Sequence, residues 1–303
     1  MSKKLKKKVT KKVTKKVVKR SVKVASKKSI KKVAKKAPVK KATKKVTAKV
    51  INKSKLNDFV IRFANVNGTG SASANFLFTK AIFRMGIPVT PKNIFPSNIQ
   101  GLPTWYEVRV SEKGYLGRRE GIDLMVAVNP QSMLTDVKSV RKGGYFLFDS
   151  SKPLHSQYHR ADINYIGIPL MQICNEAYTD ARQRQLFKNI VYVGALIALL
   201  DIEFGVVEGL LAEQFKGKEK LIPMNVKALQ LGMDYVKANF KYPLDIRVER
   251  RNLVKDWIMM EGNAACGLGA VYGGATFAAW YPITPSTSVV EGFSDFAAEF
   301  RVD

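Results

Sequence analysis

Alternation of apolar and polar positions divides the chain after residue 57 into strand-like and helix-like runs. Apolar residues at every second position, or in short unbroken runs between turn formers, are typical of strands. The sequence therefore predicts five strands. They cover residues 59–65, 106–111, 122–129, 144–149 and 164–169.

Helical spacing of apolar residues first occurs between the first two of these strands, and it predicts a helix that stops at Gly86. After residue 175 this spacing predominates. A strand, helix, strand succession indicates an α/β domain with a mostly parallel sheet, here followed by a helical segment. The helices of that segment are expected at residues 180–200, 203–215 and 224–240.

A domain at residues 57–240 follows from these elements, and residues 241–257, with dense charge, are typical of a linker. Residues 258–303 have a different texture, and a family resemblance within them implies that they are the start of another domain. There we expect a helix of small residues at 261–272, broken by Gly273 and Gly274, and then a short strand at 275–280.

A last helix is predicted to begin close to the TPST turn. Two starts remain open. Thr284 can act as the N-cap with Pro285 at the first helical position, or Ser288 and Glu291 can form a capping box.

Charge is concentrated at the N-terminus. The net charge is +28, yet residues 1–55 carry 25 Lys and Arg and no acid, which leaves 27 basic and 24 acidic residues downstream. Like charges at this density favour a disordered tail, here residues 1–56. Three interpretations stay open: a solvated appendage, a start codon assigned too far upstream, or a segment that binds nucleic acid non-specifically by counterion release.

Cys174 and Cys266 are the two cysteines, so this chain alone is not expected to hold an iron–sulfur cluster, which usually needs four thiolates. The longest apolar run, residues 190–200, is too short to cross a bilayer. The Lys-rich first 55 residues exclude a secretory signal there. We therefore expect a cytoplasmic protein without a membrane partner.

The turn at residues 67–71, NGTGS, follows a strand and opens a helix. Backbone N–H groups at such a helix start can receive an anion, which makes Gly68, Thr69 and Gly70 candidate binding residues. The alternative is a tight turn that needs glycine for a positive φ. Ser73 replaces the third glycine of the dinucleotide fingerprint, so an NAD site is not expected.

His155 and His159 are four residues apart, as in some metal sites. The glutamate of HExxH and a third ligand are missing nearby, and Pro153 indicates a loop. No metal site is predicted here.

Two segments carry a family resemblance. Residues 261–287, EGNAACGLGAVYGGATFAAWYPITPST, resemble the start of the thiamine-pyrimidine-binding domain in α subunits of 2-oxoacid:ferredoxin oxidoreductases. Residues 60–78 and 92–110 resemble the γ domain that α subunits of the 2-oxoglutarate type carry at their N-terminus. The Lys-rich tail is not part of the family pattern.

The resemblance implies oxidative decarboxylation of 2-oxoglutarate or a similar 2-oxoacid to acyl-CoA, with electrons passing to ferredoxin. Thiamine diphosphate with magnesium would be completed by a partner β subunit, coenzyme A would be the co-substrate, and the iron–sulfur cluster would lie on a partner. The expected assembly is a heterodimer or a dimer of heterodimers.

By this resemblance Thr284 faces the substrate and is the candidate catalytic residue. Gly68, Thr69 and Gly70 become a candidate coenzyme A contact. The remaining thiamine and substrate region is expected at Tyr281, Pro282, Ile283, Pro285 and Ser286.

The sequence departs from the family pattern at its end. It stops at Asp303, before the activating glutamate, and it has no GDG signature for magnesium and pyrophosphate. We therefore expect a chain cut short within the pyrimidine-binding domain and inactive alone. Two other functions stay open: a non-catalytic γ-type adaptor, and a nucleic-acid-binding protein that acts through its tail.

Overall fold

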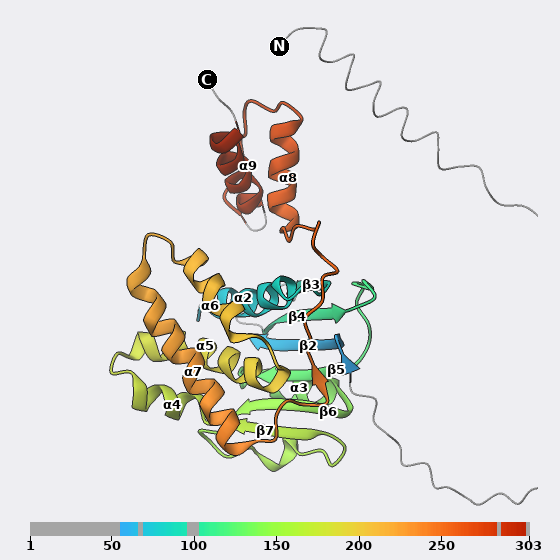
Figure 1. Ribbon diagram of the computed structural model, residues 1–303, viewed down its shortest axis with the longest axis vertical. Helices are drawn as coiled ribbons and strands as arrows, with labels where there is room; N and C mark the ends of the chain where they lie inside the picture. Colours follow the sequence, from blue (N-terminus) through green and yellow to red (C-terminus); the bar gives the residue numbers. More distant parts are fainter. Residues whose placement is uncertain (1–54, 66–68, 96–102, 284–285, 301–303) are drawn as a thin grey trace, which may run out of the picture. The chain divides into compact units, whose positions relative to one another are not determined.

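The computed structural model describes residues 55–65, 69–95, 103–283 and 286–300 (Figure 1). The predicted tail therefore lies outside the described residues, except for its last two positions. All described elements belong to one unit of the chain, residues 51–303. None of the helices in the described ranges is long and apolar enough to cross a membrane.

A six-stranded sheet is the centre of this unit, in the order β3-β4-β2-β5-β6-β7. β2, β5, β6 and β7 are parallel, and β4 runs antiparallel to both of its neighbours, β2 and β3. The predicted α/β fold with a mostly parallel sheet is confirmed. The strands are β2 Asp58–Asn65, β3 Val89–Ile94, β4 Thr104–Ser111, β5 Ile122–Ala127, β6 Val140–Asp149 and β7 Asn164–Ile168.

The five predicted strands correspond to β2, β4, β5, β6 and β7. The pattern did not predict β3, because Pro91 and Lys92 interrupt its apolar alternation. β3 lies at the edge of the sheet, where a proline is tolerated because it removes no hydrogen bond that a neighbour requires.

Each helix predicted up to residue 240 is present to within a few residues. Pro169 and Asp180 precede two of the helices, and the Asp180 side chain accepts a hydrogen bond from Gln183 N. The helices are α2 Ser71–Arg84, α3 Met133–Ser139, α4 Leu170–Ala177, α5 Ala181–Leu200, α6 Phe204–Gln214 and α7 Ile222–Asn239, with 3-10 turns at Ser156–Tyr158 and Glu219–Leu221.

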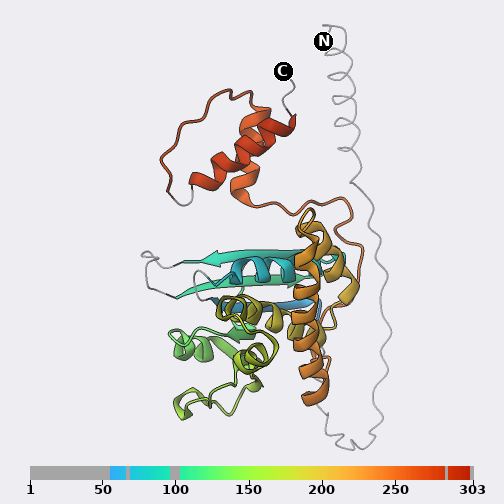
Figure 2. The same ribbon diagram turned by 90° about the vertical axis from the view of Figure 1, so that its left-hand side faces the viewer.

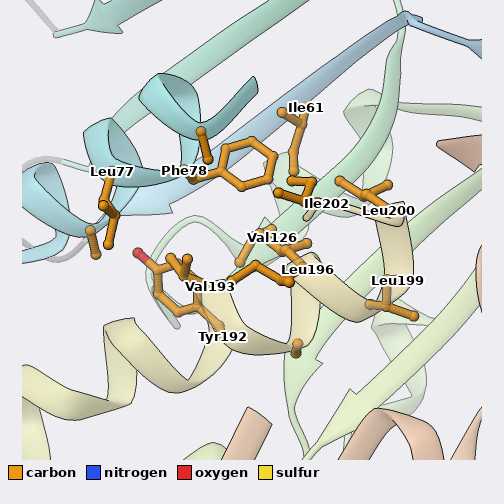
Figure 3. Close-up of a cluster of buried hydrophobic side chains, with 14 of the residues drawn as sticks. Ile61, Leu77, Phe78, Val126, Tyr192, Val193, Leu196, Leu199, Leu200 and Ile202 are labelled. Atoms are coloured by element: carbon orange, nitrogen blue, oxygen red, sulfur yellow. The ribbon is translucent and has the colours of Figure 1, made fainter. Parts of the chain in front are cut away.

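The main core lies between one face of the sheet and α2 and α5 (Figure 3). Phe63 of β2 packs edge-on against Phe78 of α2, and their ring centroids are 5.5 Å apart. The ring centroids of Phe63 and Tyr192 of α5 are 5.9 Å apart. Tyr192 is fully buried, and its hydroxyl donates to Asn75 Oδ1 at 2.7 Å. This bond satisfies a polar group that would be costly to bury alone.

α5 and α7 lie side by side (Figure 1 and Figure 2). Two glycines let their backbones meet. A Cβ on Gly194 of α5 would lie 2.0 Å from Leu229 O, and a Cβ on Gly232 of α7 would lie 2.0 Å from Val191 O. Any side chain at either position would therefore push the two helices apart.

The segment at 241–257, expected to be a linker, packs against the sheet domain instead. Its strand β8, Ile246–Arg247, pairs in parallel with β1, Lys55–Leu56, so the last two residues assigned to the tail belong to the folded unit. Val248 and Val254 are buried. The linker was predicted from the dense charge of this segment, and that criterion did not account for the buried side chains of Val248 and Val254.

Asn57, which precedes β2, is hydrogen-bonded to Glu249, which follows β8. Its Nδ2 donates to Glu249 O at 2.9 Å, and its Oδ1 accepts from Glu249 N at 2.9 Å. The residue is fully buried and has a φ of 50°, a conformation that asparagine tolerates better than most residues. The start of β2 and the segment after β8 are thereby fixed to each other.

The opposite face of the sheet carries a smaller core and a buried carboxylate. Asp136 of α3 accepts a hydrogen bond from Trp105 Nε1 at 2.7 Å and another from Ser132 Oγ at 2.6 Å. Burial raises the pKa of Asp136 to about 6, against the opposing effect of these two donors. The neutral carboxyl is therefore favoured below about pH 6, and the carboxylate predominates above it.

Gly194→Ala should reduce the free energy of unfolding by about 1–3 kcal/mol, because the new methyl group overlaps Leu229 O. Gly209→Ala is the matched control. A Cβ at Gly209 of α6 meets no atom within 4 Å, so this change should stabilise the protein by about 0.5–1 kcal/mol. Urea unfolding followed by circular dichroism measures the free energy of unfolding of both variants. Equal changes in the two variants would contradict the close contact between α5 and α7.

Asp136→Asn should remove a pH dependence of stability. The folded pKa of about 6 lies above the ordinary value of 3.8, so the contribution of Asp136 is present at low pH and is lost as pH rises through 6. Relative to the variant, the wild type should lose about 2–3 kcal/mol of unfolding free energy between about pH 4 and pH 7. A constant difference across these pH values would refute the assignment.

Candidate functional site

The turn after β2 lies at the carboxyl end of a parallel strand and leads directly into α2. Of its predicted site residues, Gly68 lies outside the described residues, while Thr69 and Gly70 are described. Gly70 is the N-cap of α2 with a φ of 77°, in the left-handed region that favours glycine. A Cβ there would also lie 3.0 Å from Leu186 Cδ2.

Helix α5 holds this turn in place. Asn189, a buried residue of α5, donates from Nδ2 to Thr69 O at 2.7 Å. The sequence prediction did not include Asn189, although an asparagine among the apolar residues of that helix was a usable signal. Thr69 is therefore held by a side chain 120 residues away in the sequence.

The first turn of α2 is suited to an anion. None of its residues is acidic, and Gly70 has no side chain to cap the helix. The first N–H groups of a helix have no partner within the helix, and the helix dipole adds partial positive charge there. This end of α2 can therefore receive a phosphate or a carboxylate.

The second candidate region is the helical hairpin of α8, Gly262–Tyr272, and α9, Ser286–Phe300. The two helices approach closely. A Cβ on Gly267 would lie 2.5 Å from Phe293 N, and Asn263 Nδ2 donates to Ser288 Oγ at 2.7 Å. The small residues that the sequence analysis singled out in α8 thus allow helix–helix packing.

Two predictions for this region are wrong. Residues 275–280 form no strand, because the turn at Gly274 leads into an exposed segment with no neighbouring strand, where Phe277 is 82% exposed. The capping box at Ser288 is also wrong, since α9 begins at Ser286 and Ser288 lies inside the helix.

The candidate thiamine and substrate residues are only partly described. Thr284 and Pro285 lie outside the described residues. Tyr281 and Ile283 are exposed, at 78% and 60%. The hydroxyl of Ser286 lies 2.7 Å from Ile283 O and donates back to this segment, so its hydrogen is already used.

Metal ligation finds little support in the described ranges, where no three His, Cys, Asp or Glu side chains cluster closely enough to hold an ion. His155 Nδ1 accepts from Gln157 N at 3.3 Å and caps a 3-10 turn. Cys174 is buried, and burial raises its thiol pKa to about 11, whereas Cys266 is exposed. Neither cysteine is placed for metal chemistry.

Comparison with known proteins agrees with this fold. Residues 60–235 match the family model described as pyruvate ferredoxin/flavodoxin oxidoreductase. Subunit alpha of 2-oxoacid:ferredoxin oxidoreductase 2 from Aeropyrum pernix is 24% identical and aligns with 76% of the chain. The 2-oxoglutarate oxidoreductase subunit KorA of Mycobacterium tuberculosis is 21% identical and aligns with 80% of the chain.

A solved structure is also similar, namely 2-oxoglutarate:ferredoxin oxidoreductase from Magnetococcus marinus with 2-oxoglutarate, coenzyme A and succinyl-CoA bound. Its TM-score is 0.69 at 27% identity over 82% of this chain. The chain spans 42% of the length of each of these three relatives. The resemblance drawn from the sequence motifs is confirmed. Because the family model covers more than half of the chain, the protein belongs to the pyruvate ferredoxin/flavodoxin oxidoreductase family.

Proposed function

We propose that the chain is an α-type component of a 2-oxoacid:ferredoxin oxidoreductase that converts 2-oxoglutarate, or a similar 2-oxoacid, to acyl-CoA and passes electrons to ferredoxin. The observation that carries this proposal is the likeness to the Magnetococcus marinus enzyme, which extends over 82% of the chain. That enzyme has 2-oxoglutarate and coenzyme A bound. The substrate and the co-substrate are transferred from it as hypotheses.

Coenzyme A carries phosphates, and the start of α2 offers backbone N–H groups without a competing acid. We therefore assign a coenzyme A phosphate to the turn at Gly68, Thr69 and Gly70. The hydrogen bond from Asn189 to Thr69 O supports this assignment, since a backbone group that is already held in place loses less entropy when a ligand binds.

Thiamine diphosphate, when bound, would supply the carbon nucleophile that attacks the 2-oxo group. The described residues of segment 281–286 include no charged side chain, and the Ser286 hydroxyl donates to Ile283 O. These residues alone do not fit a complete cofactor site, so no reaction step is assigned to them. In the proposed enzyme, other protein elements supply the activating carboxylate and the iron–sulfur cluster.

The hairpin supports the proposed β subunit as a partner. α9 has no buried residue, and large apolar side chains are exposed along the connection between the helices. Surfaces of this kind usually mark interfaces. Phe277, Trp280, Tyr281 and Ile283 are the exposed residues of the connection that the β subunit would cover.

The first test is reconstitution with a β subunit. The full chain, co-expressed with the β subunit of its own organism, should co-purify with it and reduce ferredoxin in the presence of coenzyme A and 2-oxoglutarate. Pyruvate and 2-oxoisovalerate should support at most about a tenth of that rate, corresponding to about 1.4 kcal/mol of discrimination. Co-purification without turnover of any 2-oxoacid would favour an adaptor, and failure of both would sink the proposal.

Ala72→Glu tests the coenzyme A assignment. Ala72 is exposed in the first turn of α2. A carboxylate at this position would repel a phosphate, whereas its own interaction with the helix dipole is favourable and should not destabilise the helix. We expect the KM for coenzyme A to rise about tenfold, a change equivalent to about 1.4 kcal/mol. The KM for the 2-oxoacid should stay unchanged.

Ala72→Gln is the matched control, because it adds nearly the same volume without the charge. It should leave the KM for coenzyme A within about twofold of the wild type. If both variants raise this KM equally, the effect is steric and the electrostatic assignment fails.

A further inference from the structure

A cavity of about 510 Å³ opens at the amino end of β5, away from the turn that leads into α2. Its volume lies in the range of small-molecule pockets. Three of its lining residues are arginines and only one is acidic. The lining consists of Arg62, Arg118, Arg119, Glu120, Gly121, Ile122 and Ser139.

One buried carboxylate holds two of these arginines. Glu107 of β4 has a side chain that is 3% exposed. Arg62 donates from Nε to Glu107 Oε2 at 2.9 Å, and Arg118 donates from Nε to Glu107 Oε1 at 2.9 Å. Each oxygen of Glu107 thus faces a different guanidinium, and both arginines are fixed beside the cavity.

A second buried carboxylate holds the third arginine. Asp123 of β5 is fully buried and contacts Arg119, Arg141 and Lys55, with Lys55 Nζ 3.1 Å from its Oδ1. It also accepts from Val60 N at 2.8 Å. One negative charge is therefore shared among three cations.

The arrangement leaves guanidinium donors unused. Arg62, Arg118 and Arg119 line the cavity together with the exposed Glu120, and these arginines pair with Glu107 and Asp123. Lys55 and Arg141 contact Asp123 from a neighbouring pocket, and Asp136 of α3 lies close enough to Arg62 to interact with it electrostatically. Among the described residues, the buried Nε of Arg119 has no hydrogen-bond partner. A guanidinium has five N–H donors, so Arg118 and Arg119 retain donors that the carboxylates do not use.

We propose that this cavity binds a phosphorylated small molecule, held by Arg62, Arg118 and Arg119. Guanidinium groups bind phosphate in a planar, two-pronged geometry, and the shared carboxylates keep them oriented before the ligand arrives. The cavity is separate from the proposed coenzyme A turn, because it lies where β5 begins and the turn lies where β2 ends. The proposal is therefore independent of the proposed enzymatic function.

Arginine footprinting of the full chain with phenylglyoxal tests this site, with inorganic pyrophosphate as the probe. This reagent modifies guanidinium groups, so the Lys-rich tail, whose only arginine is Arg20, contributes little to the signal. Arg118 and Arg250 are matched, since both side chains are 51% exposed and both pair with a glutamate. At about ten times its Kd, pyrophosphate should slow the labelling of Arg118 about tenfold and leave Arg250 nearly unchanged.

Glu120→Gln provides a second readout without disturbing a buried ion pair. Removal of this exposed carboxylate should tighten pyrophosphate binding at Arg118 about threefold, and Glu208→Gln on α6 should have no effect. Equal protection of Arg118 and Arg250, an unchanged affinity in Glu120→Gln, or protection by succinate at least as strong as that by pyrophosphate would each overturn the proposal.

Discussion

The contact between the backbones of α5 and α7 is the constraint on which the rest of the fold depends. Gly194 and Gly232 each face a carbonyl oxygen of the other helix, and neither position has room for a Cβ. Only at this short separation can α7 cover the outer side of α5 while α5 packs against the sheet. Tyr192 and Leu196 of α5 then reach the core formed with β2 and α2 (Figure 3).

From that position α5 also fixes the candidate anion site. Asn189 bonds to Thr69 O, and Leu186 lies beside Gly70, so these two residues are held by a helix far away in the sequence. The same helix thus takes part in the main core and in the candidate anion site. The guanidinium-lined cavity does not depend on α5. Its arginines are oriented by the buried carboxylates Glu107 and Asp123, on the face of the sheet opposite to α2 and α5.

Much of the sheet domain could be predicted from the sequence, because its strands and helices have strong period-two or helical patterns. β3 was not predicted, because Pro91 interrupts its apolar alternation. The structure tolerates this proline because β3 is an edge strand, where no required hydrogen bond is lost. Residues 275–280 were predicted as a strand from composition, yet a strand needs a neighbour and none is described there. Asn189 stands out in the sequence as an asparagine among apolar residues of α5, but its partner Thr69 could not be predicted, because their bond depends on tertiary packing.

In the proposed enzyme, this family member is one component and a β subunit covers the apolar hairpin. Hydrogen exchange of the full chain, measured with and without the β subunit, tests this contact. We expect slower exchange in α9, Ser286–Phe300, on addition of the β subunit, and unchanged exchange at residues 187–200 of α5, where most side chains are already buried. Unchanged exchange in α9 would contradict the proposed contact.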